Sequence, residues 1–220
     1  MDKSLLSSEI FEKIESLKTE IKLRSSGRAR LLPVTKSFSS EVISAVLDSG
    51  VSEVGENYAQ ELLSKHSELE RFDPKWHMLG RLQRNKIKSL AGVITLWQTI
   101  DRPELIKTLA RLVPEANILI QVNVLQQKGQ GGCGISEVER LLTLAVDSGL
   151  EVRGLMTIGA SGDIKATRNA FETVIRLADQ LHLTERSMGM SSDFLLALDC
   201  GSTLVRLGTA IFGPRPATKI

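Results

Sequence analysis

Cysteine is scarce in this chain: only Cys133 and Cys200 occur among 220 residues, and they form no CxxC motif. This usage indicates neither a disulfide framework nor a zinc site, and it suits a reducing compartment. Long apolar runs are also missing, since no stretch approaches the ~18 residues of a membrane span. The first twenty residues are too charged for the apolar core of a signal peptide. We therefore expect a cytoplasmic protein without a metal site.

An excess of one charge is absent as well. The chain has 28 Lys and Arg residues against 26 Asp and Glu residues, a formal net charge of +2. This balance gives no reason to expect nucleic acid or a membrane as a partner. No linker or low-complexity tract divides the chain, so we expect a single domain over residues 1–220. Because no association surface is evident in the sequence, we expect a monomer.

Helical periodicity opens the chain, and strand-like runs follow it. Apolar residues recur at spacings of three and four up to the break at 25–27, namely Leu6, Ile10, Ile14, Leu17 and Ile21. The expected strands are 30–35, 52–54, 75–78, 93–96, 117–123, 151–156, 186–187 and 203–206. The expected helices between them are 39–49, 57–70, 84–91, 102–113, 136–148, 163–182 and 192–199. This alternation predicts a parallel sheet.

Eight such units in about 200 residues fit a closed (β/α)₈ TIM barrel of the α/β class, with an extra N-terminal helix. An open doubly wound sheet is the alternative, and the lack of a GxGxxG motif after the first strand weighs against it. In a barrel, functional groups lie at the C-terminal ends of the strands. By that rule the residues expected to meet at one opening are Lys36, Asn57, His77, Met156, Thr157, the 187–191 segment and Arg206.

Lys36 ends an apolar strand, where loss of water disfavours its charged form. A neutral amine attacks aldehydes and forms Schiff bases. A lysine that reaches out to solvent is the simpler interpretation of the residue alone. The C-terminal segment favours a Schiff-base lysine, because Arg206 is followed by the turn Gly208-Thr209, whose N–H groups can hold a phosphate.

The 187–193 segment resembles a helix start, with Ser191 or Ser192 as the N-cap. Phosphate sites of barrels often use the loops after the seventh and eighth strands, so Ser187 and Ser191 are also candidates for phosphate binding. Met188 could pack on a flat ring, although single methionines are more often core residues. The glycine-rich run 128–134 is expected to form a mobile loop that exposes Cys133, with nothing nearby that marks it as a nucleophile.

Longer motifs occur in order: LPVTK at 32–36, GENYAQE at 55–61, WHMLGRLQRNK at 76–86, RGLMTI at 153–158, SMGMS at 187–191 and the closing 201–213 segment. With them the chain resembles the pyridoxal-phosphate homeostasis proteins, single-domain relatives of the alanine racemase barrel. The resemblance implies that Lys36 carries pyridoxal 5′-phosphate as a Schiff base and that Arg206 faces the pyridine nitrogen. It also places Ser187, Ser191, Gly208 and Thr209 around the phosphate, and Asn57 and His77 near the ring.

The chemistry of such a site argues against efficient catalysis. An arginine beside the pyridine nitrogen keeps its own proton and weakens the ring as an electron sink. Alanine racemases add a second domain that supplies a tyrosine base, whereas the one tyrosine here, Tyr58, lies at an expected helix start. We therefore expect a protein that holds, buffers or delivers the cofactor, with transient contacts to enzymes that use it. A small amino-acid racemase or lyase, and a cofactor-free Schiff-base aldolase, are the alternatives.

Overall fold

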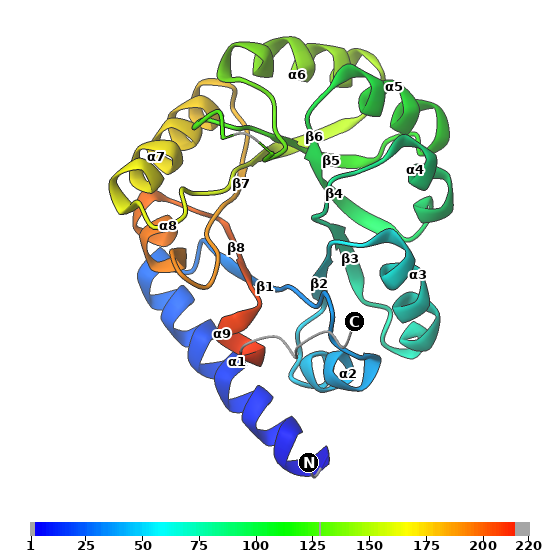
Figure 1. The fold of residues 1–220 in the computed structure, drawn as a ribbon, viewed down its shortest axis with the longest axis vertical. Helices are drawn as coiled ribbons and strands as arrows, with labels where there is room; N and C mark the ends of the chain where they lie inside the picture. Colours follow the sequence, from blue (N-terminus) through cyan, green and yellow to red (C-terminus); the bar gives the residue numbers. More distant parts are fainter. Residues whose placement is uncertain (1–2, 128, 214–220) are drawn as a thin grey trace.

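The computed structural model describes residues 3–127 and 129–213, in which strands and helices alternate along the chain (Figure 1). The strands are β1 (Arg30–Pro33), β2 (Glu53–Glu56), β3 (Lys75–Met78), β4 (Ile94–Ile100), β5 (Asn117–Gln121), β6 (Glu151–Met156), β7 (Glu185–Ser187) and β8 (Leu204–Leu207). The helices are α1 (Lys3–Ser25), α2 (Ser40–Asp48), α3 (Ala59–Glu68), α4 (Arg84–Leu90), α5 (Pro103–Leu112), α6 (Val138–Asp147), α7 (Ile164–Gln180), α8 (Phe194–Cys200) and α9 (Thr209–Phe212). Two 3₁₀ turns, Glu70–Phe72 and Ile135–Glu137, complete the described elements.

The strands form one parallel sheet in the order β1-β8-β7-β6-β5-β4-β3-β2. Its two end strands meet through a parallel bridge between Val34 and Gly55. The N–H of Thr35 donates to the Gly55 carbonyl at 2.9 Å and extends this contact. The sheet therefore curls into a barrel with helices outside it, which confirms the predicted TIM barrel (Figure 1).

The extra N-terminal helix, α1, lies outside the barrel and contacts α2, α8 and α9 (Figure 1). It buries Ile10, Ile14 and Ile21 on one face, as the spacing predicts. The side chain of Leu6 lies outside the described part of the structure. The helix ends at Ser25, where Ser26 and Gly27 take positive φ angles and turn the chain toward β1. None of the described helices is long and apolar enough to cross a membrane.

Many predicted boundaries differ from the structure by one or two residues, and two differences are informative. The strand expected at 93–96 continues to Ile100, because Gln98 and Thr99 lie inside a buried strand although they are polar. The helix expected from residue 192 begins at Phe194, with Asp193 in the N-cap position instead of Ser191 or Ser192. In both cases, tertiary packing decides where the element begins or ends, and the local pattern of polar residues does not show it.

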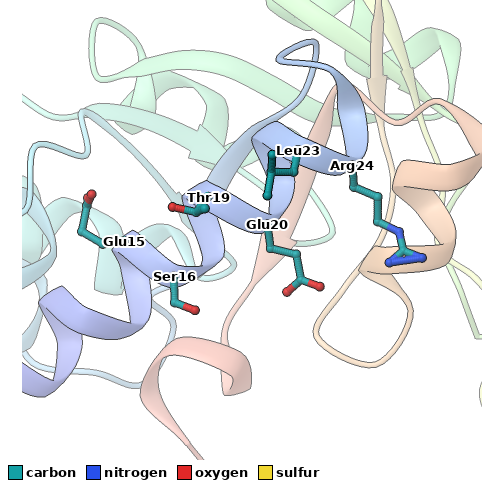
Figure 2. Close-up of a pocket in the computed structure, with 6 residues that line it drawn as sticks. All are labelled: Glu15, Ser16, Thr19, Glu20, Leu23 and Arg24. Atoms are coloured by element: carbon teal, nitrogen blue, oxygen red, sulfur yellow. The ribbon is translucent and has the colours of Figure 1, made fainter.

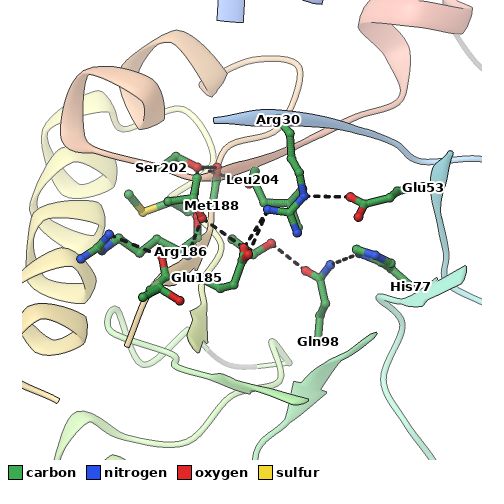
Figure 3. Close-up of polar contacts among 12 residues, drawn as sticks. Arg30, Glu53, His77, Gln98, Glu185, Arg186, Met188, Ser202 and Leu204 are labelled. Carbon is green, nitrogen blue, oxygen red and sulfur yellow. Dashed lines mark hydrogen bonds and ion pairs between the residues drawn. The ribbon is translucent and has the colours of Figure 1, made fainter. Parts of the chain in front are cut away.

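Charged residues close the N-terminal end of the barrel. Arg30, the first residue of β1, donates from Nε to Glu53 Oε2 at 2.8 Å and from Nη1 to both Glu185 carboxylate oxygens at 3.0 Å. The two glutamates are the first residues of β2 and β7. Figure 3 shows Arg30 between its two carboxylate partners. Ion pairs thus join three strands at the end opposite the predicted opening.

Candidate functional site

A cavity of about 350 Å³ lies at the C-terminal ends of the strands. Such a volume suits a small ligand. Six of the predicted site residues line it: Lys36, Asn57, Ser191, Arg206, Gly208 and Thr209. The remaining lining residues are Val34, Phe38, Leu79, Met156, Ile158, Met190 and Ser192. The cavity therefore combines one amine and one guanidinium with an otherwise apolar and hydroxyl-bearing wall.

The backbone around Lys36 is held on both sides. Before it, the Thr35 carbonyl accepts a hydrogen bond from Lys65 Nζ at 2.8 Å, and the Thr35 side chain is fully buried. After it, the Ser37 N–H donates to Glu61 Oε1 at 2.6 Å. Ser37 has a φ of 67°, in the left-handed region that non-glycine residues adopt rarely. Helix α3 thus fixes the short segment from which the Lys36 amine projects.

The source of this anchoring is a buried ion pair. Lys65 Nζ lies 2.8 Å from Glu56 Oε2 and 2.6 Å from Glu61 Oε1. Burial raises the pKa of the Glu56 carboxyl, and the Lys65 ammonium opposes that shift. Glu56 also accepts the N–H of Asn57 at 2.9 Å, so the same carboxylate places the next lining residue. The i,i+4 spacing of Glu61 and Lys65 was visible in the sequence, but the burial of Glu56 was not.

Arg206 lies in β8 with its side chain buried. Its Nη1 donates to Ser187 Oγ and its Nη2 to the Thr157 carbonyl, each at 2.8 Å. Burial lowers the pKa of Arg206 to about 10, and the negative charge of Asp193 opposes this. The guanidinium therefore stays protonated at neutral pH, although both of its hydrogen-bond partners are uncharged.

The loops after β7 and β8 are joined at the other side of the cavity. Ser191 Oγ accepts the N–H of Ala210 at 3.0 Å, and the Gly208 carbonyl accepts the N–H groups of Ile211 and Phe212. Among the described residues, no acceptor faces the N–H groups of Gly208 and Thr209. These two amides, beside the Ser191 hydroxyl, form the part of the wall best suited to an anion.

Aromatic packing connects this wall to the lysine segment. The rings of Phe38 and Phe212 lie 4.4 Å apart between centroids. Phe38 follows Lys36 by two residues and lines the cavity, whereas Phe212 ends α9. This contact joins the segment that carries Lys36 to the helix that follows Gly208.

Three predicted site residues lie elsewhere. His77 and Ser187 are buried beneath the cavity, where they belong to a chain of polar contacts that includes Arg206. Met188 packs with Phe171, Leu196 and Ala197 in a separate apolar cluster. The geometry does not support direct contact of these three with a ligand in the cavity. Met190, the second methionine of the same segment, lines the cavity instead.

The glycine-rich segment differs from its prediction. Cys133 is buried and pairs with the end of β5: its N–H donates to the Gln121 carbonyl, and its carbonyl accepts the N–H of Asn123, both at 2.9 Å. Gly132 N–H donates to Asp101 Oδ2 at 3.1 Å. Burial raises the pKa of the Cys133 thiol to about 12. The prediction of an exposed cysteine is wrong, and the thiol stays protonated. Lys128 lies outside the described residues.

A second hollow, of about 790 Å³, runs along the outer face of α1 (Figure 2). All of its lining residues belong to that one helix: Glu15, Ser16, Thr19, Glu20, Leu23 and Arg24. No strand end contributes to it, and Arg24 forms an ion pair with Asp199. This surface lacks the enclosed, convergent groups of the barrel opening. No group of three or more possible metal-ligating side chains occurs among the described residues.

Comparison with known proteins assigns the family. A family model described as the N-terminal domain of alanine racemase matches residues 11–216. The pyridoxal phosphate homeostasis protein of Aquifex aeolicus is 36% identical over 199 residues, covering 85% of this chain and 87% of that protein. The one from Haemophilus influenzae is 35% identical over 224 residues, covering 94% and 93%. This chain belongs to the pyridoxal phosphate homeostasis protein family.

Solved structures agree with this assignment. PipY of Synechococcus elongatus, solved without PLP, is 30% identical and superposes with a TM-score of 0.83 over 93% of this chain and all of PipY. A second PipY structure has PLP bound and gives a TM-score of 0.80. Alanine racemase of Corynebacterium glutamicum, at 21% identity and a TM-score of 0.70, shares the fold. It matches 97% of this chain but only 62% of the racemase.

The sequence interpretation missed Gln98, a buried polar residue inside the barrel. Its amide lies between His77 and Ser187 inside the barrel, and it is fully buried. The available signal was a glutamine followed by a threonine within an otherwise apolar stretch. Because the predicted strand ended at residue 96, the prediction left Gln98 outside the sheet, whereas the structure places it in β4 with its side chain buried.

Proposed function

We propose that this chain binds pyridoxal 5′-phosphate, holds it as a Schiff base on Lys36, and buffers or delivers it within the cell. The observation that carries the proposal is the meeting of Lys36 and Arg206 on the wall of one small cavity. The amine corresponds to the aldehyde of that ligand, the fixed cation to its ring nitrogen, and the Gly208 and Thr209 amides to its phosphate. The family membership and the PLP-bound structure of PipY support it.

The residues divide the work of binding. Lys36 supplies the primary amine, and its anchored backbone keeps that amine at the opening. Gly208, Thr209 and Ser191 provide hydrogen-bond donors for a phosphate group. Arg206 presents a protonated guanidinium to the polar edge of the ring. The bound cofactor supplies an electrophilic aldehyde and a conjugated ring.

The same residues argue for a carrier and against an enzyme. Arg206 keeps its proton at neutral pH, so it cannot protonate the pyridine nitrogen, and the ring is a weaker electron sink. Apart from Lys36, the described lining residues include no His, Tyr, Cys, Asp or Glu that could act as a general base. Tyr58 is 56% exposed and does not line the cavity. No observation favours the racemase, lyase or aldolase alternatives.

A trapping experiment tests the proposal. Purified protein is mixed with pyridoxal phosphate, its visible absorbance is recorded, and the adduct is reduced with borohydride and located by peptide mapping. The pyridoxyl group is expected on Lys36, and Lys36→Ala is expected to lose the absorbance while remaining folded. Lys88→Ala, at an exposed position of α4, is the matched control and should behave as the wild type.

Lys65 serves as an internal control in the same map. It is buried and paired with two carboxylates, so it should stay unmodified. Label found mainly on a lysine other than Lys36 would refute the assignment. Sustained turnover of any common amino acid by the loaded protein would refute the carrier proposal. A monomeric state, a cytoplasmic location and transient contacts with pyridoxal-phosphate enzymes remain part of this proposal.

A further inference from the structure

A chain of hydrogen bonds crosses the barrel beneath the cavity. His77 Nδ1 on β3 lies 2.8 Å from Gln98 Nε2 on β4, and Gln98 Oε1 accepts from Ser187 Oγ on β7 at 2.6 Å. Ser187 Oγ in turn accepts from Arg206 Nη1 on β8 at 2.8 Å. Figure 3 shows Gln98 and His77 joined inside the barrel. All four side chains are buried, with at most 5% of Arg206 exposed.

The direction of every bond in this chain follows from Arg206. A guanidinium only donates, so Ser187 Oγ must accept from it and can direct its own proton to Gln98 Oε1. The amide NH₂ of Gln98 therefore faces His77, whose Nδ1 must accept. The imidazole is then neutral with its proton on Nε2. Burial, which lowers the pKa of His77 to about 4, agrees with a neutral ring.

The opposite amide orientation satisfies fewer groups. If Gln98 were turned over, Ser187 Oγ would accept from both Arg206 and the amide. Its own proton would then lack an acceptor among the described contacts. A buried donor without an acceptor costs roughly 1–3 kcal/mol. One arrangement of protons is thus preferred across four strands.

Gln98 links the two halves of this chain, because its amide contacts both His77 and Ser187. It is the only member that receives the Ser187 proton, and this leaves the Ser187 lone pairs directed at Arg206. The second fixed bond of Arg206, to the Thr157 carbonyl, holds the other side of the guanidinium. Both terminal nitrogens are thus bonded to residues below the cavity, and no further hydrogen-bond partner of this guanidinium occurs among the described residues. Arg206 also lines the cavity, where its remaining N–H groups can meet a ligand.

We propose that Gln98 is a positioning residue, which acts through Ser187 to orient the Arg206 guanidinium toward the ligand cavity and fixes His77 as the Nε2–H tautomer. The effect on ligand binding rests on the proposed function, because it assumes that pyridoxal phosphate occupies the cavity. The effect on the His77 tautomer does not, because it concerns the ligand-free protein.

The ligand-free arm measures the imidazole ¹⁵N chemical shifts by NMR. The protein has three histidines, and a His77→Gln variant identifies the signals of His77. The wild type is expected to show a neutral Nε2–H ring at pH 7. Ser187→Ala leaves His77 and Gln98 in place but removes the hydroxyl that donates to Gln98 Oε1, so Arg206 no longer determines how the Gln98 amide is oriented. Mixed His77 tautomers are expected in this variant.

The binding arm compares two substitutions on β4. Gln98→Leu removes both contacts of the amide, and affinity for pyridoxal phosphate is expected to fall about tenfold. Thr99→Val is the matched control, since Thr99 is equally buried and donates to the Gly80 carbonyl at 2.8 Å outside the chain of contacts. It should lose stability without losing affinity. Ser187→Ala should weaken affinity in the same direction as Gln98→Leu, which keeps the test valid if the leucine variant fails to fold.

Three results would overturn the inference. The first is a wild-type His77 that carries its proton on Nδ1, and the second is an unchanged His77 tautomer in Ser187→Ala. The third is an affinity for pyridoxal phosphate in Ser187→Ala, or in a folded Gln98→Leu, that equals the affinity of Thr99→Val. Failure of the wild type to bind pyridoxal phosphate would instead refute the proposed function. The NMR arm would then still decide whether Gln98 fixes the His77 tautomer.

Discussion

Two arginines at opposite ends of the barrel, Arg30 and Arg206, differ in the charge of their hydrogen-bond partners. Arg30 is paired with Glu53 and Glu185, and although burial disfavours its charge, the hydrogen bonds to these carboxylates together raise its pKa. Arg206 is more deeply buried, its hydrogen-bond partners among the described residues are neutral, and burial lowers its pKa to about 10. Two carboxylates thus contact one cation, whereas none of the described carboxylates forms an ion pair with the other.

The difference separates stability from binding. A buried charge without a paired counter-charge lowers the stability of the folded state, and such strain persists at sites where it serves function. At the N-terminal end the ion pairs join strands and need no further partner. At the C-terminal end, the proposed function supplies a further hydrogen-bond acceptor for the guanidinium when the ligand occupies the cavity. Variants at the two ends should therefore fail in different assays.

The largest effect is expected for Arg206→Met. Loss of the charged donor should weaken pyridoxal phosphate binding about 100-fold, because hydrogen bonds to charged groups contribute roughly 1.5–3 kcal/mol. The unfolding free energy of the ligand-free protein should change little, since removal of the desolvated charge offsets the lost bonds to Ser187 and Thr157. Absorbance titration and urea unfolding measure the two quantities. Intact affinity with a large loss of stability would contradict this role.

His77, between the two ends, predicts an acid sensitivity. Its folded pKa is lowered to about 4 by burial, with smaller effects of Arg30 and Lys75 in the same direction and of Glu53 against it. Between pH 6.5 and 4 the unfolded chain binds the proton and the folded chain does not, so stability falls with pH. From pH 6.5 to 5.0 the loss should be about 2 kcal/mol.

Urea unfolding at several pH values measures this slope. The contribution of His77 is fully present above pH 6.5 and is lost as the pH falls toward 4. His77→Gln removes the titrating group, so its unfolding free energy should depend less on pH in this window. Parallel pH profiles of the two proteins would show that His77 titrates normally.

The third effect concerns the N-terminal end. Arg30→Met leaves Glu53 and Glu185 without their shared cation, and the unfolding free energy should fall by about 1 to 2 kcal/mol. The magnitude is limited because 40% of the Arg30 side chain is exposed. Affinity for pyridoxal phosphate, measured on the folded fraction, should match the wild type. A weakened affinity would show that the two ends are coupled.

The barrel and the cavity-lining residues were accessible to sequence analysis because they depend on local signals. Strand–helix alternation predicts the fold, and the residues just after strands, such as Lys36 and Gly208, line the opening as that fold requires. Depth inside the barrel is different, because it depends on the stagger between strands. His77 and Ser187 end their runs like Lys36, yet they lie one layer below the cavity.

Partner identity was also beyond the sequence. The acceptors of Arg206 come from β7 and from the segment after β6, and those of Arg30 come from β2 and β7. These contacts join residues separated by up to 155 positions. Nothing in the local pattern distinguishes the paired arginine from the unpaired one. Their contrast follows only from the closed sheet.

The smallest effect is expected for Gly208→Ala, which tests the C-terminal end of the barrel alone. Gly208 has a φ of −114°, which any residue adopts, and an added Cβ would lie 3.5 Å from the Val34 carbonyl oxygen and 3.8 Å from Val34 Cβ. These are ordinary contacts, so Gly208→Ala should leave stability unchanged. Gly189 contrasts with it: its φ is 96°, and an added Cβ would lie 2.6 Å from Ala197 Cβ.

Gly208→Ala should nevertheless weaken pyridoxal phosphate binding about fivefold, because the new methyl group occupies space beside the proposed phosphate position. Binding of pyridoxal, which lacks the phosphate, should be unaffected and provides the control. Titration of both ligands, with thermal unfolding of the free protein, separates the cases. Equal affinity of the variant and the wild type for pyridoxal phosphate would place the phosphate elsewhere in the cavity. The amides of Gly208 and Thr209 would then lose their assigned role, while that of Lys36 would stand.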